Sequence, residues 1–191
     1  MTTATESAPC TTPRRWKISV DLAEQMVRTG IVAEDEPIEL VEGVFYERLP
    51  RGPWHDASVQ ILGDALRRRG SIVSIKNALR LNEFSAPEPD VALLTFREDY
   101  YRAGGAGPGD VLLVVEVSDS SADHDRDVKL PLYARAGIPE AWLVTREPAA
   151  IEAYRSPREG VYTEMRTYLR GDTISPMALP DVRIAVSAVT R

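Results

Sequence analysis

The chain has 191 residues, of which 43% are hydrophobic, and this size and composition suit one domain with a substantial buried core. Its net charge of -6 argues against a broad basic surface for non-specific binding of duplex DNA, although acids gathered at a metal site would contribute to that charge. No run approaches the ~18 apolar residues of a membrane span, so no membrane contact is expected.

The N-terminal residues 1–15 are rich in Thr, Ser and Pro and are predicted to form a disordered tail, which leaves residues 16–191 as a single domain. This tail lacks the apolar core of a signal peptide, which predicts a cytoplasmic protein. The only cysteine, Cys10, lies in the tail, so an internal disulfide and a cysteine-based metal site are both excluded.

The first half of the chain contains signals for helices, a hairpin and strands. The expected elements are a helix over 19–29, a hairpin over 38–49, a helix over 55–69 and strands over 72–81 and 90–96. Ser19 or Asp21 can cap the first helix, and Glu42-Gly43 is a turn signal that predicts the hairpin.

The second half is richer in strands. The expected elements are strands over 111–117, 141–146, 150–155, 161–169 and 182–189, with a helix over 123–137. The segment 111–117, VLLVVEV, lacks polar alternation, which is typical of a central strand covered on both faces. Pro131 must lie in the first turn of its helix or kink it. The strands 150–155 and 161–169 are expected to pair as a hairpin. This order predicts an α/β or α+β domain with a mixed central sheet flanked by helices.

The most informative pattern combines Asp90, Glu116 and Lys129. Asp90 follows Pro89 at a strand edge, where proline blocks ladder pairing and leaves the acid accessible. Glu116 lies near the end of the apolar strand, where a carboxylate requires a compensating cation. Two carboxylates that meet where neighbouring strands diverge suit Mg²⁺, which polarises a phosphoryl oxygen and acidifies a bound water. Lys129 could orient or deprotonate that water, although the second role requires a lowered pKa, or neutralise charge on phosphate.

Each of these residues also has a structural interpretation. Asp90 could be a turn or cap residue, Glu116 could pair with a buried Arg or Lys, and Lys129 could be a solvated helix residue. Glu39 and Glu42 in the hairpin could add a further acid. His55 could act as a proton carrier or could be a helix N-terminal residue with a hydrogen-bonded ring.

Two further residues flank the lysine. Asp125 precedes Lys129 by four positions, so on a regular helix the two share a face and either form an ion pair or let Asp125 hold the lysine in place. His124 has no partner pattern and is predicted to lie at the surface.

Five segments in order resemble the Uma-type restriction endonucleases of bacteria, a branch of the PD-(D/E)xK nuclease superfamily. IELVEG resembles the family's ELxDG hairpin, GPWHDASVQILGDAL its histidine-led helix, PEPDVALL its PD motif, DVLLVVEVSDSS its second acid, and DRDVKLPLYARAGIPEAWLV its lysine segment. Together they span roughly residues 20–155. The resemblance implies a restriction-endonuclease-like fold in which Asp90 and Glu116 bind the metal, Lys129 is the catalytic lysine and Glu39 occupies the early acidic position.

The chain departs from the superfamily pattern at one informative place. The lysine usually follows the second acid by two residues, but Ser118 stands there, so Lys129 must reach in from the following helix. Two other departures, Val44 and Ala141, do not touch the proposed metal site.

The resemblance implies an endonuclease that hydrolyses phosphodiester bonds in DNA with Mg²⁺, or Mn²⁺ in its place. A homodimer would suit an enzyme that cuts both strands. The alternative is a non-catalytic binding or accessory module that keeps the acids as a structural network. A third interpretation is a hydrolase of RNA or of a small phosphate ester.

Overall fold

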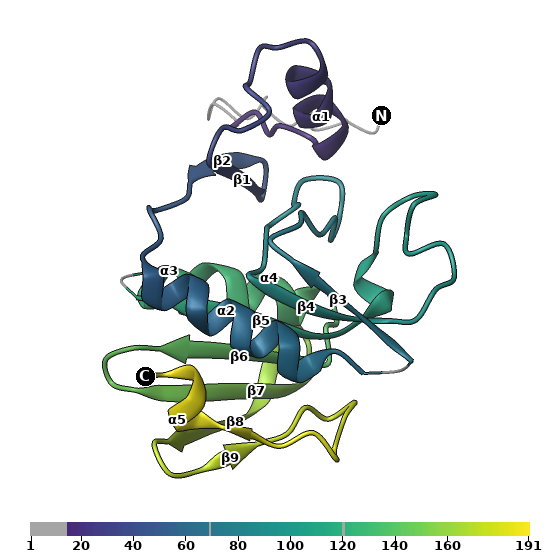
Figure 1. Ribbon diagram of the computed structural model, residues 1–191. Coiled ribbons are helices and arrows are strands. Elements are labelled where there is room, and N and C mark those ends of the chain that lie inside the picture. Colours follow the sequence, from purple (N-terminus) through teal and green to yellow (C-terminus); the bar gives the residue numbers. More distant parts are fainter. Residues whose placement is uncertain (1–14, 69, 120) are drawn as a thin grey trace, which may run out of the picture.

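The computed structural model describes residues 15–68, 70–119 and 121–191 (Figure 1). Its centre is a sheet of six strands, in spatial order β3 (Ser71–Ile75), β4 (Val91–Thr95), β5 (Val111–Ser118), β6 (Glu140–Thr145), β7 (Ala150–Arg158) and β8 (Val161–Leu169). β5 and β6 are parallel, and every other neighbouring pair is antiparallel. The sheet is therefore mixed, as predicted, and the expected hairpin of β7 and β8 is confirmed.

Helices cover both faces of this sheet. α2 (Pro53–Leu66) and α5 (Val186–Val189) pack on one face, and α4 (Leu130–Arg135) packs on the other (Figure 1). Successive side chains of a strand point to opposite faces, so each strand contributes to two cores. Along β4, for example, Leu93 packs with the α2 core and Ala92 with the α4 core. The burial of both faces explains why VLLVVEV shows no polar alternation.

The N-terminal part forms a separate layer above the sheet in Figure 1. It consists of α1 (Val20–Arg28) and the hairpin of β1 (Ile38–Val41) and β2 (Val44–Glu47). Ser19 caps α1, because its Oγ accepts a hydrogen bond from the backbone N–H of Leu22 at 3.2 Å. Glu42 and Gly43 both have positive φ (52° and 83°), as the predicted tight turn requires.

Backbone contacts fix the hairpin against the segment that leads into β4. The N–H of Gly43 donates to the carbonyl of Phe84 at 2.7 Å, and the N–H of Ala86 donates to the carbonyl of Leu40 at 2.8 Å. A side chain at Gly43 would collide with Lys17, whose Cβ lies 2.5 Å from the position of an added Cβ. The hairpin is thereby held beside the PD motif, although β1 does not pair with the main sheet.

Three predicted boundaries are wrong. The strand expected over 72–81 ends at Ile75, because Lys76 adopts a left-handed backbone conformation with φ of 52°. The helix expected over 55–69 begins at Pro53, a residue suited to the first helical turn, and ends at Leu66. The strand expected over 182–189 is strand only at β10 (Ile184–Ala185), which pairs with β9 (Thr173–Ile174), and then turns into α5, whose valines are buried beside α2.

The predicted helix over 123–137 is divided by a π-helical turn. α3 (Ala122–His124) leads into η2 (Asp125–Lys129), in which the N–H of Leu130 donates to the carbonyl of Asp125, and α4 follows. Pro131 is the second residue of α4 and directly follows the π-helical turn, so the missing N–H falls at the junction of the two helical segments. Gly137, with φ of 77°, follows the end of the helix as expected. α3, η2 and α4 connect β5 to β6, and a short 3-10 turn, η1 (Pro108–Asp110), directly precedes β5.

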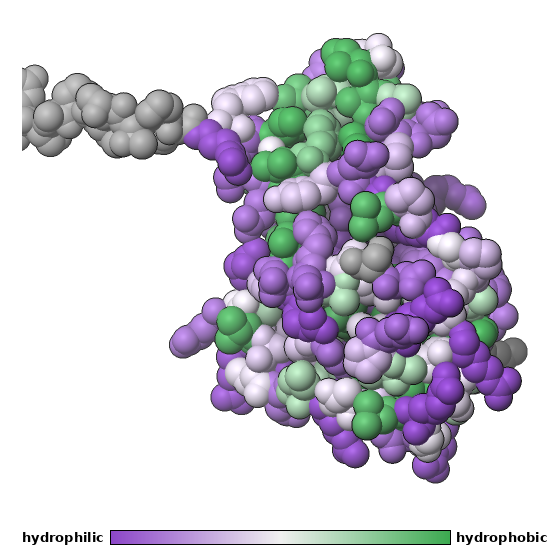
Figure 2. All heavy atoms as spheres, turned by 90° about the vertical axis from the view of Figure 1, so that its left-hand side faces the viewer, coloured by the Kyte–Doolittle hydropathy of each residue, from purple (hydrophilic) through white to green (hydrophobic). Residues whose placement is uncertain are grey.

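The surface is mostly polar, with an apolar area near the N-terminal layer. Figure 2 shows hydrophobic side chains gathered over α1 and hydrophilic ones over most of the rest of that face. Trp16 and Ile31 are among the most exposed large apolar residues, at 76% and 72%. No helix in the described part of the chain combines the length and apolar character needed to cross a bilayer. Cys10 and all of the predicted tail except residue 15 lie outside the described ranges.

Candidate active site

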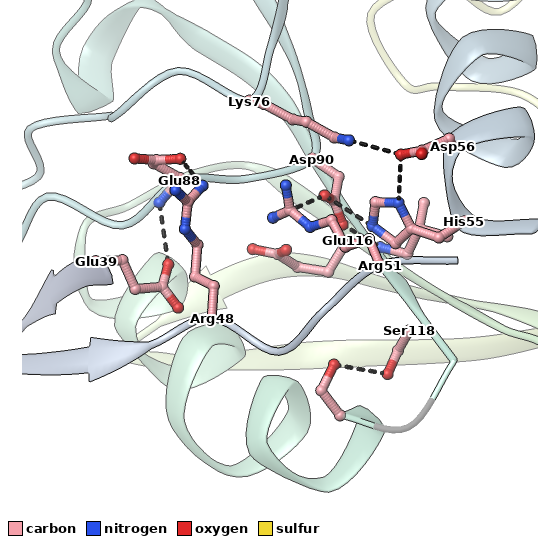
Figure 3. Close-up of polar contacts among 12 residues, drawn as sticks. Glu39, Arg48, Arg51, His55, Asp56, Lys76, Glu88, Asp90, Glu116 and Ser118 are labelled. Carbon is pink, nitrogen blue, oxygen red and sulfur yellow. Dashed lines mark hydrogen bonds and ion pairs between the residues drawn. The ribbon is translucent and has the colours of Figure 1, made fainter. Parts of the chain in front are cut away.

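All five predicted site residues line one cavity of about 360 Å³. They reach it from separate elements: Glu39 from β1, His55 from α2, Asp90 from the residue before β4, Glu116 from β5, and Lys129 from η2. All five are buried. Figure 3 shows Asp90 with His55 on one side and Glu116 on the other. The convergence predicted from the sequence pattern is therefore present, whereas the catalytic roles of these residues remain a prediction.

The pairing of two strands brings Asp90 and Glu116 together. Val91 of β4 pairs with Val115 of antiparallel β5, so the next position on each strand, Asp90 and Glu116, are neighbours. Both side chains lie on the α4 side of the sheet, since each is two residues from a member of the α4 core. The backbone N–H of Val117 also donates to Oδ2 of Asp90 at 2.9 Å. Strand register, and not loop conformation, sets the distance between the two acids.

Asp90 has His55 and Arg51 as close neighbours but keeps one oxygen without a well-formed hydrogen bond. His55 Nε2 lies 3.0 Å and Arg51 Nη2 3.3 Å from its Oδ1. Among the described residues, neither contact has hydrogen-bond geometry, and Oδ1 is a buried oxygen with no bonded partner. Burial raises the pKa of Asp90, but the contacts with His55 and the charge of Arg51 outweigh burial and leave the pKa below its ordinary value of 3.8.

Glu116 and Glu39 share Lys129. Lys129 Nζ lies 3.0 Å from Oε2 of Glu39 and 3.3 Å from Oε1 of Glu116, and Tyr133 donates its hydroxyl to the same Oε1 at 2.5 Å. The three charged side chains of this group are each about 5% exposed. The backbone N–H of Glu88 donates to Glu39 at 3.1 Å, so the early acid is tied to the PD segment.

The charges of this group decide what the lysine can do. Burial raises the pKa of Glu116 well above its ordinary value of 4.5, although Lys129 opposes the rise. Burial lowers the pKa of Lys129, but the surrounding carboxylates of Glu116, Glu39 and Asp125 outweigh burial and raise it. The lowered pKa that a lysine base requires is therefore absent. Asp125 makes no described ion pair with Lys129 and instead accepts a hydrogen bond from Ser121 at 2.8 Å.

The position of His55 fits its structural interpretation as a helix N-terminal residue with polar contacts to its ring, while a role in proton transfer stays a prediction. It is the third residue of α2, and its ring is buried with a polar partner at each nitrogen. Nε2 faces Asp90 at 3.0 Å, Nδ1 faces Asp56 at 3.4 Å, and Lys76 Nζ donates to Asp56 at 2.8 Å (Figure 3). A chain of polar contacts therefore runs from Lys76 through Asp56 and His55 to Asp90, and it fixes the orientation of the imidazole.

Sequence reasoning missed three residues that line or support the cavity. Arg51 lies in the irregular segment between β2 and α2, where no periodicity indicates the direction of a side chain. Tyr133 follows Lys129 by four residues, so on a helix the two share a face. This spacing could have indicated that Tyr133 lies near the cavity, where it donates a hydrogen bond to Glu116. His124 was expected at the surface, but it is half-buried, lines the cavity and packs on the ring of Tyr46 with centroids 5.2 Å apart.

The acidic lining of the cavity could hold a divalent cation. It includes six Asp or Glu side chains and three Lys or Arg side chains, so acidic groups outnumber basic ones by three. No group of three or more His, Cys, Asp or Glu side chains within the described ranges is arranged to hold a metal ion. Asp90 and Glu116 would therefore be joined by water ligands, which is the usual coordination of Mg²⁺ in proteins. Oδ1 of Asp90, which contacts His55 and Arg51 but accepts no hydrogen bond from a described residue, is the atom that would best fit such a cation.

Two comparisons with known proteins give a family and a fold for the chain. Residues 23–187 match the Uma2 family, described as "Putative restriction endonuclease". The fold is similar to the crystal structure of a putative nuclease belonging to DUF820 from Anabaena variabilis ATCC 29413, with a TM-score of 0.68 and 13% identity over 91% of this chain and 97% of that chain. This similarity confirms the predicted restriction-endonuclease-like fold. A search of the curated proteins gives no match.

Proposed function

We propose a metal-dependent nuclease active site for this chain, which belongs to the Uma2 family of putative restriction endonucleases. The family and the fold support a nuclease, and the metal, the substrate and the residue roles are inferred from the cavity. The observation that carries the proposal is the adjacent pair of buried acids, Asp90 and Glu116, with Lys129 Nζ 3.3 Å from Glu116. A purely structural sheet has no need for three ionisable groups at one point of its interior.

Asp90 and Glu116 are the residues that would hold a divalent cation, with Mg²⁺ as the expected ion and Mn²⁺ as its substitute. When bound, such a cation polarises a phosphoryl oxygen and makes a coordinated water more acidic. Asp90 would contribute the Oδ1 that lacks a hydrogen bond, while the N–H of Val117 fixes its other oxygen. Tyr133 fixes Oε1 of Glu116 in the same way. Both ligands are therefore oriented before the cation arrives.

Lys129 would act as a cation and hydrogen-bond donor. Its neighbours Glu39 and Glu116 favour the protonated ammonium, so it orients the attacking water or neutralises charge on the phosphate and does not remove a proton. His55 supports Asp90 through Nε2 and is itself positioned by Asp56. Because its ring is engaged at both nitrogens, we assign it to positioning Asp90 and not to carrying protons to solvent.

The substrate we propose is DNA, cut at a phosphodiester bond. A homodimer, whose two cavities would act on the two strands, and a cytoplasmic location complete the proposal. One observation favours the alternative of a non-catalytic module: Lys129, Arg51 and His55 already face the acids, as they would in a permanent structural network.

A cleavage assay separates the two functions. Supercoiled plasmid and single-stranded RNA would be incubated with the protein in Mg²⁺, in Mn²⁺ or in chelator. Asp90→Asn and Lys129→Met are each expected to reduce metal-dependent DNA cleavage at least about 100-fold. Asp64→Asn is the matched control, because Asp64 is exposed, does not line the cavity and has only surface partners, Gln60 at 3.1 Å and Arg67 at 3.6 Å.

Three results would be informative in different ways. Cleavage of RNA but not plasmid would correct the substrate. Cleavage that survives in folded Asp90→Asn and Lys129→Met would reject the active site. Wild type that cleaves neither substrate, and whose melting temperature does not respond to Mg²⁺, would support the non-catalytic module.

A further inference from the structure

Arg51 has an unusual position among the basic residues of the cavity. Its side chain is about one quarter exposed, and its guanidinium lies 3.3 Å from Oδ1 of Asp90 (Figure 3). Oδ1 is also the oxygen without a bonded partner, and thus the atom that the proposed function assigns to the cation. A guanidinium therefore lies where a second positive charge is expected to bind.

The two nitrogen-bearing side chains beside Asp90, those of His55 and Arg51, are held very differently. His55 is 4% exposed, belongs to α2 and has Asp56 on its other nitrogen, so it is fixed from behind. Arg51 also lines the cavity, but its side chain is 24% exposed and belongs to the irregular segment between β2 and α2. A metal ion entering through the cavity would therefore meet one firmly held neighbour of Asp90, His55, and one less constrained neighbour, Arg51. Since like charges repel strongly in a partly buried site, Arg51 is the group that would move.

The other basic side chains of the cavity have partners that a metal at Asp90 and Glu116 would leave in place. Arg48 pairs with Glu88, which lies outside the pair of proposed ligands. Lys129 keeps Glu39 at 3.0 Å even if Glu116 turns to a metal. The described ion pair of Arg51, by contrast, is with a proposed ligand itself. Binding of the cation would thus release one guanidinium into a cavity open to solvent.

We propose that Arg51 is an internal counter-ion of Asp90 that a divalent cation displaces, and that the displaced guanidinium then binds the phosphodiester of the substrate. This inference rests on the proposed function. A planar guanidinium can donate two parallel hydrogen bonds to phosphate oxygens, which a lysine cannot. The site would therefore offer its phosphate ligand only when the metal is present, and without metal Arg51 would neutralise the acid.

The first test is a calorimetric titration of Mg²⁺ into metal-free wild type, Arg51→Gln, Arg51→Lys and Arg135→Gln. Arg51→Gln removes the competing charge and is expected to bind Mg²⁺ about fivefold more tightly, the order of magnitude of one partly exposed ion pair. Arg51→Lys keeps the charge and should stay within about twofold of wild type. Arg135→Gln is the control for losing an arginine elsewhere, since Arg135 is half-exposed and pairs with Glu42.

The second test measures binding of a labelled DNA duplex with Ca²⁺ in place of Mg²⁺, across a series of salt concentrations. Arg51→Gln is expected to bind the duplex about fivefold more weakly, with the slope of log Kd against log salt reduced by about 1, because one phosphate contact is lost. Arg135→Gln should match wild type. The same substitution thus strengthens metal binding and weakens substrate binding, a combination that simple loss of structure does not produce.

Failure of this inference is distinguishable from failure of the proposed function. Mg²⁺ affinity that is unchanged or weaker in folded Arg51→Gln would overturn the counter-ion role, even if wild type binds metal and cleaves DNA. Unchanged duplex affinity and salt slope would overturn the phosphate role. Wild type that is folded but binds neither Mg²⁺ nor the duplex would reject the proposed function and this inference together.

Discussion

Two buried glutamates lie on the neighbouring parallel strands β5 and β6 and have opposite surroundings. Glu140 accepts hydrogen bonds from Trp142 Nε1 at 2.9 Å and Arg155 Nε at 2.8 Å on one oxygen, and from the backbone N–H of Met177 at 2.7 Å on the other. Glu116 has two partners on Oε1 and lies in a cavity with an excess of acids. Glu140 thus ties the segment between β9 and β10 to the sheet, whereas Glu116 is the residue that we propose as a metal ligand.

The difference shows that burial of a carboxylate does not by itself indicate a functional site. Glu140 is completely buried, more so than Glu116 at 3%, yet its charge is matched by one arginine and its oxygens are satisfied within the chain. Glu116 differs in having further acidic side chains close by. Its neighbour Asp90 also has an oxygen that accepts no hydrogen bond from a described residue. The following predictions test whether one glutamate is structural and the other functional.

The largest effect is expected for Glu140→Ala. This substitution leaves Arg155, Trp142 Nε1 and the N–H of Met177 without their acceptor, and it should lower the free energy of unfolding by roughly 3 kcal/mol. Urea unfolding followed by circular dichroism measures the change. A loss below about 1 kcal/mol would show that the Glu140 cluster is not the structural counterpart we describe.

Glu116→Gln should have the reverse profile. Cleavage of DNA should fall at least about 100-fold because a metal ligand is lost. The free energy of unfolding should be equal to or higher than that of wild type, because burial disfavours the charge of Glu116 and the amide removes it. If Glu116→Gln unfolds as easily as Glu140→Ala while retaining activity, the assignments of the two glutamates would be interchanged.

A matched pair of smaller substitutions removes one donor from each glutamate. Tyr133→Phe deletes the hydroxyl that orients Glu116 and should weaken Mg²⁺ binding about tenfold. Trp142→Phe deletes the donor to Glu140 and should cost about 1 kcal/mol of stability without changing Mg²⁺ affinity. Calorimetry and urea unfolding of both variants measure these changes. Equal Mg²⁺ affinities of the two variants would show that the donor to Glu116 matters no more for metal binding than the donor to Glu140.

The pH dependence of stability gives the finest test. The pKa of Glu116 is raised by folding above its ordinary value of 4.5, so above that pH the folded state binds more protons than the unfolded state and stability falls as pH rises through the folded pKa. Glu116→Gln lacks this proton. In chelator, its stability advantage over wild type should therefore grow with rising pH above 4.5, by no more than about 1.4 kcal/mol per pH unit. An advantage that shrinks over this range would contradict the raised pKa.

Much of the site could be predicted because it depends on strand periodicity and short spacings. Asp90 and Glu116 meet through the register of two apolar strands, and the turn at Glu42-Gly43 was visible in two residues. The direction of Arg51 could not be predicted, because an irregular segment has no period to reveal it. Nor could the donors of Glu140, since Arg155 and Met177 reach it only through folding.

The misplaced boundaries have the same physical origin. β3 ends before Lys76, because the backbone of Lys76 adopts a left-handed conformation. A lysine in the sequence gives no indication of that conformation. The valines of α5 favour a strand by propensity, but packing beside α2 and a hydrogen bond from Ser58 to the carbonyl of Val189 at 2.7 Å override it. Local patterns therefore predicted which elements exist, while contacts distant in sequence decided where they end.

The most direct measurement is a calorimetric titration of Mg²⁺ into metal-free wild type, Asp90→Asn, Glu116→Gln and Trp142→Phe, each with and without a DNA duplex. We predict binding to wild type and to Trp142→Phe, and loss of binding in Asp90→Asn and Glu116→Gln while both remain folded. Binding that persists in the two acid variants, or folded wild type that binds no Mg²⁺ even with DNA present, would contradict the assignment of the cavity as a metal-dependent nuclease site.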